Sequence, residues 1–263
     1  MKRKYSIEER RSKILNLLHT EGRVQVEQLV ETFAVSEVSI RKDLAVLEER
    51  KLLVRVKGGA IALHQAGDLD DMSISRKQQL HAREKQLIGR FAAGLIHDGE
   101  RLIFDSGTTT MEIAKNLEPF KDLTVITNAL DIAITVNNYG RFNVIVLGGS
   151  MRAVSHSTVG MISEYALKNI FCDKLFLGVD SISIKDGIST PSLVEASLNQ
   201  AMIGAAREVI AVFDSSKFGR RTFAHIADLD KITAIITDSH ISPELKDYIE
   251  KSHITLHIVD IDN

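Results

Sequence analysis

The sequence of 263 residues contains one cysteine, three prolines and no tryptophan. The single cysteine, Cys172, excludes a disulfide framework and a zinc site built on cysteines. No run of about 18 apolar residues occurs, which excludes a helix that spans a membrane. The charged start, MKRKYSIEERR, has no apolar run behind it and is unlike a signal peptide. We expect a soluble protein of a reducing compartment, the cytoplasm, with no membrane partner, no cofactor and no metal.

Composition and charge point to a globular protein with two unlike parts. Hydrophobic residues make up 44% of the chain and charged residues 26%, which excludes wholesale disorder. The net charge of −2 conceals an asymmetry, because residues 1–60 carry 13 Lys and Arg against 9 Asp and Glu, whereas the remainder carries 20 against 26. A basic head on an acidic body is typical of a protein in which one part meets nucleic acid, although many solvated surfaces are locally basic.

Apolar residues at helical spacing predict three helices in the head. The first helix ends at Glu21-Gly22, and its apolar side comprises Ile14, Leu15, Leu17 and Leu18. The second has one apolar face, formed by Val26, Leu29, Val30 and Phe33. After a tight turn at Ala34-Val35, Ser36 is a good N-cap for the third helix. The buried stripe of that helix is Ile40, Leu44 and Leu47.

The third helix has a short basic face opposite its buried stripe. Val38, Lys42 and Ala45 lie on this face, with Ser39 and Arg41 beside it. Slim residues allow close approach to the major groove, and cations bind phosphate or guanine. Residues 52–60 alternate like a hairpin strand and predict a wing over the DNA backbone. The candidate DNA-binding residues are Ser36, Val38, Ser39, Arg41, Lys42, Arg55 and Lys57. A three-helix bundle with a solvated basic face fits the same periodicity.

Residues 10–60, which include VQVEQLVETFAVSEVSIRKDLAVLEERKLLVRVKGGA, resemble the winged helix-turn-helix of the DeoR family of bacterial transcription regulators. The resemblance implies binding to operator DNA. The sequence departs from the family pattern at two positions. Lys51 stands where the family usually has glycine after the recognition helix, and Lys57 stands where it often has histidine. Lys57 keeps a cation in the wing.

Residues 61–74 mix glycine, aspartate and small residues without a period, and we interpret them as a linker. A long helix is predicted over 75–96. Strands and helices then alternate, with strands at 102–104, 123–127, 143–147, 174–179, 209–213, 232–237 and 254–259 and helices at 109–117, 131–137, 162–170, 195–207 and 243–251. Apolar strands joined by helical crossovers predict a parallel sheet covered on both faces, and such sheets bind ligands beyond the carboxyl ends of their strands.

Polar clusters follow five of the predicted strands. The turn 105–110, Asp-Ser-Gly-Thr-Thr-Thr, combines a glycine, hydroxyls and the N–H groups of a helix start, which suits an anion. An ordinary capped helix would look the same at any one strand, but five such clusters favour a ligand site. The candidate ligand-binding residues in these clusters are Asp105, Ser106, Gly107, Thr108, Thr109, Thr110, Thr127, Asn128, Gly148, Gly149, Arg152, Asp180 and Lys217.

The order DSGTTT, VITN, LGG, LFLGVD, GIST, DSSKF in residues 75–260 resembles the effector domain of the same family, which is similar in turn to ribose-5-phosphate isomerase. The resemblance implies a phosphorylated sugar as effector, with the phosphate held by Ser106 and the hydroxyls of 108–110. By the same resemblance, Asp180, Glu195 and Lys217 would lie around the sugar. The run 176–218 is most similar to regulators of amino-sugar and galactitol use.

A sugar-phosphate isomerase with an appended DNA-binding head is the alternative function. In the isomerases a second Asp would stand at the position of Ser183, and a Lys-Gly-Gly segment would replace Ile188-Ser189-Thr190. Glu195 matches the isomerase base, but a lone carboxylate cannot both abstract a proton and stabilise the enediolate charge. We therefore expect binding without turnover and no catalytic residue.

The combined interpretation is an α/β protein in which a winged helix-turn-helix precedes a mostly parallel, Rossmann-like sheet domain. We expect a DNA-binding domain at 1–60, a linker at 61–74 and a sugar-phosphate domain at 75–260. One head contacts few bases, so we expect a homo-oligomer, either dimer or tetramer. The sequence leaves open whether the regulator is a repressor or an activator, and whether His156, close to Arg152, contacts the ligand.

Overall fold

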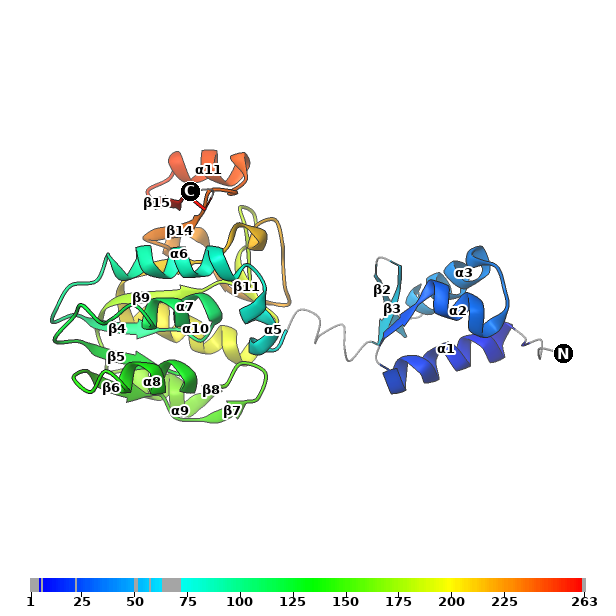
Figure 1. The fold of residues 1–263 in the computed structure, drawn as a ribbon, viewed down its shortest axis with the longest axis horizontal. Helices are drawn as coiled ribbons and strands as arrows, with labels where there is room; N and C mark the ends of the chain where they lie inside the picture. The colour runs from blue at the N-terminus through cyan, green and yellow to red at the C-terminus, as the bar shows by residue number, and fades with distance from the viewer. Residues whose placement is uncertain are drawn as a thin grey trace. The chain divides into compact units, whose positions relative to one another are not determined.

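The computed structural model describes residues 5, 7–21, 23–49, 52–56, 58–62 and 72–261. Contacts divide the chain into two compact units, Met1–Asp70 and Asp71–Asn263, and Figure 1 shows both. No helix in the described ranges is long and apolar enough to cross a membrane.

The described residues of the first unit form three helices and a small antiparallel sheet. The helices are α1 (Ile7–Glu21), α2 (Val26–Phe33) and α3 (Glu37–Glu49), and the strands are β1 (Arg23–Gln25), β2 (Leu53–Val56) and β3 (Gly59–Ala62). The strand order is β1-β3-β2, so β2 and β3 form the predicted wing. The sequence did not predict β1, since three residues are too short to show a strand period.

The helices of the first unit bury the predicted apolar faces. Ile14, Leu29, Ile40 and Leu44 are each at most 1% exposed, and they share one core with Leu18, Phe33 and Leu47. Ser36 caps α3 as predicted, because the backbone N–H of Ser39 donates to its hydroxyl at 3.3 Å. Burying the Ile40–Leu47 stripe fixes which side of α3 remains exposed.

A buried ion cluster joins α1 to α3. The carboxylate of Asp43 accepts from Arg10 Nε at 2.5 Å and from Arg11 Nε at 2.9 Å. The side chain of Asp43 is 3% exposed and that of Arg10 is 9% exposed. A buried charge that loses its partner is strongly destabilising, so this cluster fixes the position of α3 against α1.

The second unit is built on a parallel sheet of seven strands in the order β15-β14-β12-β9-β4-β5-β6. These strands are β4 (Arg101–Phe104), β5 (Thr124–Thr127), β6 (Asn143–Val146), β9 (Cys172–Gly178), β12 (Ala206–Val212), β14 (Ala234–Asp238) and β15 (Thr255–Val259). The helices that cover it are α6 (Ala82–Ala93), α7 (Thr108–Ala114), α8 (Leu130–Asn137), α9 (Met161–Leu167), α10 (Leu193–Ala205) and α11 (Pro243–Glu250). The predicted fold class is confirmed.

Alternate residues of the strands enter two separate cores. Leu102 and Phe104 pack on the face covered by α6, α7 and α8, together with Phe176. Ile103 packs on the opposite face, under α9, α10 and α11, together with Leu175. Because both faces are buried, the strand sequences read as continuous apolar runs.

The predicted single helix over 75–96 is wrong. The chain forms α5 (Ile74–Gln79) and then α6, because His81 adopts a left-handed conformation with φ 52° that no helix continues through. The amine of buried Lys85 donates to the backbone oxygens of Lys77, at 2.5 Å, and Leu80, at 2.6 Å. These bonds satisfy carbonyl groups that the end of α5 leaves unpaired.

The helix predicted over 195–207 is also wrong at its end, since α10 stops at Ala205 and residues 206–212 form β12. Pairing of β12 with β9 and β14 outweighs helical propensity there. Five short antiparallel strands were not predicted: β7 (Ser150–Arg152), β8 (Ser157–Val159), β10 (Ser181–Ser183), β11 (Gly187–Thr190) and β13 (Ala224–Ala227).

We expect Asp43→Ala to lower the free energy of unfolding of the first unit by about 3–5 kcal/mol, because it leaves two arginines without their buried carboxylate. The matched control is Glu37→Ala, which breaks the exposed Arg41–Glu37 pair and should change stability by about 0.5 kcal/mol or less. Amide exchange of α1 and α3 in the full chain measures both. Equal effects of the two substitutions would contradict the assignment.

Candidate functional site

The exposed face of α3 carries the predicted side chains. Val38 is 75% exposed, and Arg41 and Lys42 are also exposed. Arg41 forms an ion pair with Glu37, one turn earlier, at 2.6 Å. Ser39 is half-buried and its hydroxyl lies 3.0 Å from that of Ser36. The face is therefore slim and accessible, as a helix that enters a groove requires.

The wing presents Arg55 beside α3. Arg55 is exposed on β2, its backbone N–H donates to Glu48 Oε1 at 2.9 Å, and its guanidinium lies 3.8 Å from Glu48 Oε2. The contact connects the wing to α3. The predicted contribution of Lys57, and the departure at Lys51, fall outside the described residues.

A pocket in the second unit lies at the carboxyl ends of β4, β9 and β12, and its empty volume is about 650 Å³ with the open mouth included. Eight of the predicted residues line it: Asp105, Ser106, Gly107, Thr108, Thr109, Asp180, Glu195 and Lys217. They come from the turn between β4 and α7, the residues after β9, the first turn of α10 and the turn after β12. The parallel sheet brings these four segments together.

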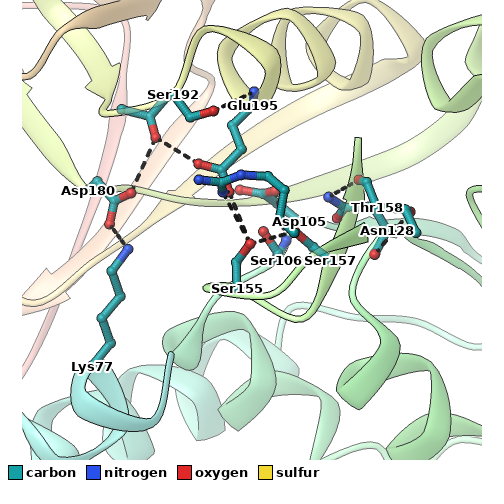
Figure 2. A network of polar contacts seen from close by, with 12 residues as sticks. Lys77, Asp105, Ser106, Asn128, Ser155, Ser157, Thr158, Asp180, Ser192 and Glu195 are labelled. Atoms are coloured by element: carbon teal, nitrogen blue, oxygen red, sulfur yellow. Dashed lines mark hydrogen bonds and ion pairs between the residues drawn. The ribbon is translucent and has the colours of Figure 1, made fainter. Parts of the chain in front are cut away.

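Arg152 reaches this group through an ion pair. Its guanidinium contacts the carboxylate of Glu195 and donates to Ser155 Oγ at 3.1 Å. Glu195 also accepts from Ser155 Oγ and from Thr190 Oγ1, each at 3.3 Å, and the labelled side chains of Ser155 and Glu195 point toward each other in Figure 2. Both oxygens of the Glu195 carboxylate therefore have partners within the protein.

The remaining predicted residues do not line the pocket. Thr110 donates to the backbone oxygen of Gly107 at 2.9 Å, Thr127 accepts from Ala129 N–H at 3.0 Å, and Asn128 donates to Thr158 O at 3.1 Å. These bonds hold local turns and the β7–β8 hairpin.

Gly148 and Gly149 also have structural reasons for their place in the sequence. A Cβ on Gly149, which has φ 132°, would lie 2.5 Å from the backbone oxygen of Val159. The glycine therefore allows the chain to approach β8. Gly148 offers its backbone oxygen to the hydroxyl of Ser163.

A second ion pair crosses the pocket. Lys77 Nζ on α5 lies 2.6 Å from Asp180 Oδ1, and Figure 2 shows the lysine reaching up from α5 to this carboxylate. The same Thr190 hydroxyl lies 3.3 Å from the other oxygen of Asp180, and because it has one hydrogen it donates to either Asp180 or Glu195. A ligand hydroxyl that bonds to Asp180 or Glu195 therefore competes with existing contacts.

Asp105 sits at the base of the pocket. Burial raises the pKa of its carboxyl to about 8, with the nearby charge of Glu195 as the second cause, while bonds from Asn199 and the backbone of Ser106 act against the increase. At neutral pH the group is mainly protonated. A protonated carboxyl can donate a hydrogen bond as well as accept one.

Cations surround the same region. Burial lowers the pKa of Lys85, and the positive charges of Lys217 and Lys77 lower it further, while Asp214 opposes the shift. Lys77, Lys85 and Lys217 all line the pocket. Their mutual repulsion favours an anion as the occupant.

Sequence reasoning missed several residues of the pocket wall: Met72, Ile74, Lys77, Lys85, Val154, Ser155, Thr190 and Asn199. The sequence places Lys77 and Lys85 in one continuous helix, in which lysines are normally exposed to solvent. These two lysines are eight residues apart, and only the structure shows that the helix is broken between them. His156, which the sequence left open, lies 2.9 Å from Asp131 and is not part of the wall.

The head and the pocket define a two-part regulator with one unit for DNA and one for a small ligand, and comparisons with known proteins agree. Residues 10–66 match the DeoR-like helix-turn-helix domain, and residues 80–239 match the DeoR C-terminal sensor domain. The chain belongs to the DeoR family of transcriptional regulators and is not an enzyme.

Curated relatives cover nearly the whole chain. The putative aga operon transcriptional repressor of Escherichia coli O157:H7 is 36% identical over 98% of this chain and 96% of its own length. The transcriptional repressor GlcR of Bacillus subtilis is 34% identical over 97% of both chains. Ribose 5-phosphate isomerase A of Methanocaldococcus jannaschii has a TM-score of 0.37 at 14% identity, over 51% of this chain and 53% of that chain, which is too weak to carry an argument.

We expect Asp105→Asn to change how stability depends on pH. The folded pKa, about 8, is above the ordinary value of 3.8, so the native state binds more protons and the free energy of unfolding falls as pH rises from 4 to 8, by at most about 1.4 kcal/mol per unit. Asparagine removes this dependence. Thermal unfolding of both proteins between pH 5 and 9 measures the effect. The stability of the variant relative to the wild type should increase with pH up to about pH 8. A pH-independent difference would contradict the shift.

Proposed function

We propose that the protein represses a sugar-utilisation operon and leaves its operator when a phosphorylated sugar occupies the pocket. The names of the relatives support repression, because the aga operon protein, GlcR and the lactose phosphotransferase system protein of Staphylococcus epidermidis are all called repressors. The domains we propose are the DNA-binding domain 1–60, the linker 61–74 and the sensor 75–260, with the linker shortened at both ends because the wing strand β3 runs to Ala62 and α5 begins at Ile74. The protein acts on DNA in the cytoplasm.

In this proposal α3 enters the major groove and the wing lies over the backbone. The exposed side of α3 supplies Val38, Arg41 and Lys42 to bases and phosphates, and Ser36 and Ser39 lie at its N-terminal end, where recognition helices approach the bases. Arg55 and Lys57 contact backbone phosphates. Since one such head reads few base pairs, two heads of a homo-oligomer, dimer or tetramer, bind two half-sites.

The phosphate lies at the cationic end of the pocket, against the turn between β4 and α7. Ser106, Thr108 and Thr109 offer hydroxyls and backbone N–H groups there, and Lys85 and Lys217 supply charge. Burial is the first cause of the lowered pKa of Lys85, Asp214 opposes it, and the charges of Lys217 and Lys77 lower it further. A dianion in this position adds to the counter-charge of Asp214 and offsets the repulsion between the lysines.

The sugar lies toward Asp180 and Glu195. Hydroxyl groups are both donors and acceptors, and the region holds carboxylates together with Thr190, Asn199 and the protonated Asp105. The guanidinium of Arg152 forms an ion pair with Glu195. A lone glutamate held in an ion pair is unsuited to proton abstraction, which fits binding without turnover.

The observation that carries the proposal is a pocket at the strand ends that combines three lysines with a hydroxyl-rich turn. Thermal unfolding of the purified chain should shift upward with one member of a panel of glucosamine 6-phosphate, galactosamine 6-phosphate, galactitol 1-phosphate and ribose 5-phosphate. A ligand at about 100 times its Kd stabilises the protein by about 2.7 kcal/mol. Inorganic phosphate is the reference, and no shift with any sugar phosphate would contradict the proposal.

We expect Thr109→Glu to abolish the response to effector while leaving DNA binding without effector intact. Thr109 is 8% exposed and lines the pocket, so the new carboxylate excludes phosphate by volume and like charge. The matched control is Thr255→Glu, at an exposed position of β15 away from the pocket. Titrations of a DNA fragment selected by the wild type, with and without the ligand, measure both. A variant that responds like the wild type shows that phosphate binds elsewhere.

We expect Arg41→Ala and Arg55→Ala to weaken DNA binding in different ways. Arg55→Ala removes a phosphate contact, so affinity for all sequences falls and the salt slope decreases by about one. Arg41→Ala should lower the affinity for the selected fragment more than the affinity for random DNA, because Arg41 faces the groove. Equal losses on both DNAs for Arg41→Ala would show that Arg41 only positions the protein.

A further inference from the structure

Two segments far apart in the sequence form one wall of the pocket and share a main-chain hydrogen bond. Met72, Ile74 and Lys77 belong to the start of the second unit, and Val154 and Ser155 belong to the turn between β7 and β8. The N–H of Ile74 donates to the backbone oxygen of Val154 at 2.8 Å. Ile74 is the first residue of α5, so this N–H has no partner within its own helix. The bond therefore fixes the start of α5 to the turn.

The turn is attached in addition to the pocket acid Glu195. Arg152, at the end of β7, pairs with its carboxylate, and Ser155 donates to Oε1 while lying 2.8 Å from Ser157 Oγ. Figure 2 shows Ser155, Ser157 and Glu195 gathered at one place. A sugar hydroxyl that bonds to Oε1 of Glu195 does so in competition with Arg152 and Ser155. Ligand binding at this oxygen and attachment of the turn to Glu195 therefore exclude each other.

The conformation of the turn depends on its contacts. His156 has φ 50°, a left-handed conformation that costs a non-glycine residue about 1–2 kcal/mol. Its ring lies 2.9 Å from the Asp131 carboxylate, and its backbone oxygen accepts from Leu130 N–H at 3.0 Å. Such a conformation persists only while surrounding contacts hold it. Loss of the contacts at Glu195 therefore removes part of what holds the turn.

We propose that residues 153–156 form a latch that reports occupancy of the pocket to α5. In the structure the latch is closed on Glu195, and Val154 holds Ile74. A sugar hydroxyl takes Glu195 from Arg152 and Ser155, the turn withdraws, and Ile74 loses its bond. The released α5 directly follows the chain segment that leads to the DNA-binding head, so DNA affinity falls. The inference rests on the proposed function, because it requires a ligand in this pocket.

Ile74→Pro removes the one N–H that the latch holds. Proline is tolerated at the first position of a helix, and Ser73, with φ −57° and ψ 145°, already has the extended conformation that a residue before proline requires. The matched control is Ile74→Ala, which also shortens the buried side chain but keeps the N–H. The difference between the two variants isolates the hydrogen bond.

The DNA probe is a fragment selected from a random pool by the wild type, and the ligand is the panel sugar phosphate that shifts wild-type melting most. We expect the ligand to weaken wild-type DNA binding fivefold or more. Without ligand, Ile74→Pro should bind DNA as weakly as the wild type does with ligand. Adding the ligand should change the DNA affinity of Ile74→Pro less than twofold. Because coupling is reciprocal, Ile74→Pro should also bind the sugar phosphate more tightly by the same factor. Ile74→Ala shortens a side chain of the pocket wall and can change the affinity for the ligand, but at saturating ligand its DNA binding should still weaken fivefold or more.

The latch is wrong if Ile74→Pro responds to ligand as Ile74→Ala does, or if it binds the sugar phosphate more weakly than Ile74→Ala. A wild type that responds to no panel member, while Ile74→Pro still weakens DNA binding relative to Ile74→Ala, would contradict the sugar-phosphate proposal and support the latch. Should Ile74→Pro fail to fold, hydrogen exchange of the Ile74 amide in the wild type replaces it. Protection should fall tenfold or more on adding the sugar phosphate, and unchanged protection would overturn the latch.

Discussion

Burial of both faces of the seven-stranded parallel sheet is the constraint from which the rest of the second unit follows. Leu102, Phe104 and Phe176 pack on one side, and Ile103 and Leu175 on the other, so no face of the sheet is left for a ligand. Parallel strands end at a common edge. The turn after β4, the residue pair after β9 and the turn after β12 therefore meet there, and the polar groups that these segments carry form the pocket.

Two ion pairs of that pocket are already formed in the structure, while Lys85 and Lys217 carry the positive charge that favours an anion. Lys77 pairs with Asp180, Arg152 pairs with Glu195, and burial keeps Asp105 largely protonated. Any ligand that uses these groups must exchange one set of contacts for another. A binding site of this kind converts occupancy into rearrangement, whereas a site with unused groups would bind without changing anything else. For a regulator this property matters more than affinity.

The head meets the opposite requirement, because it must present one fixed surface. Ile40, Leu44 and Leu47 bury one side of α3, and Asp43 ties the same helix to α1 through two arginines. The wing is connected to α3 through Arg55 and Glu48. A face that reads DNA keeps its shape through these contacts.

The sequence by itself determined the elements whose signals are local. The apolar period of Val26–Phe33, the cap at Ser36 and the continuous apolar strands were all readable, and the order of motifs identified the family. Seven pocket residues, including Asp105 and Lys217, were found because polar clusters follow several buried strands whose carboxyl ends meet, and Glu195 was found through the family resemblance. Tertiary structure alone decided the rest. The left-handed His81 that separates α5 from α6, the approach of Lys77 to Asp180 and the bond from Ile74 to Val154 join residues far apart in the chain. Periodicity reports only which side of an element is buried, whereas such contacts depend on how the whole sheet and its helices close in space.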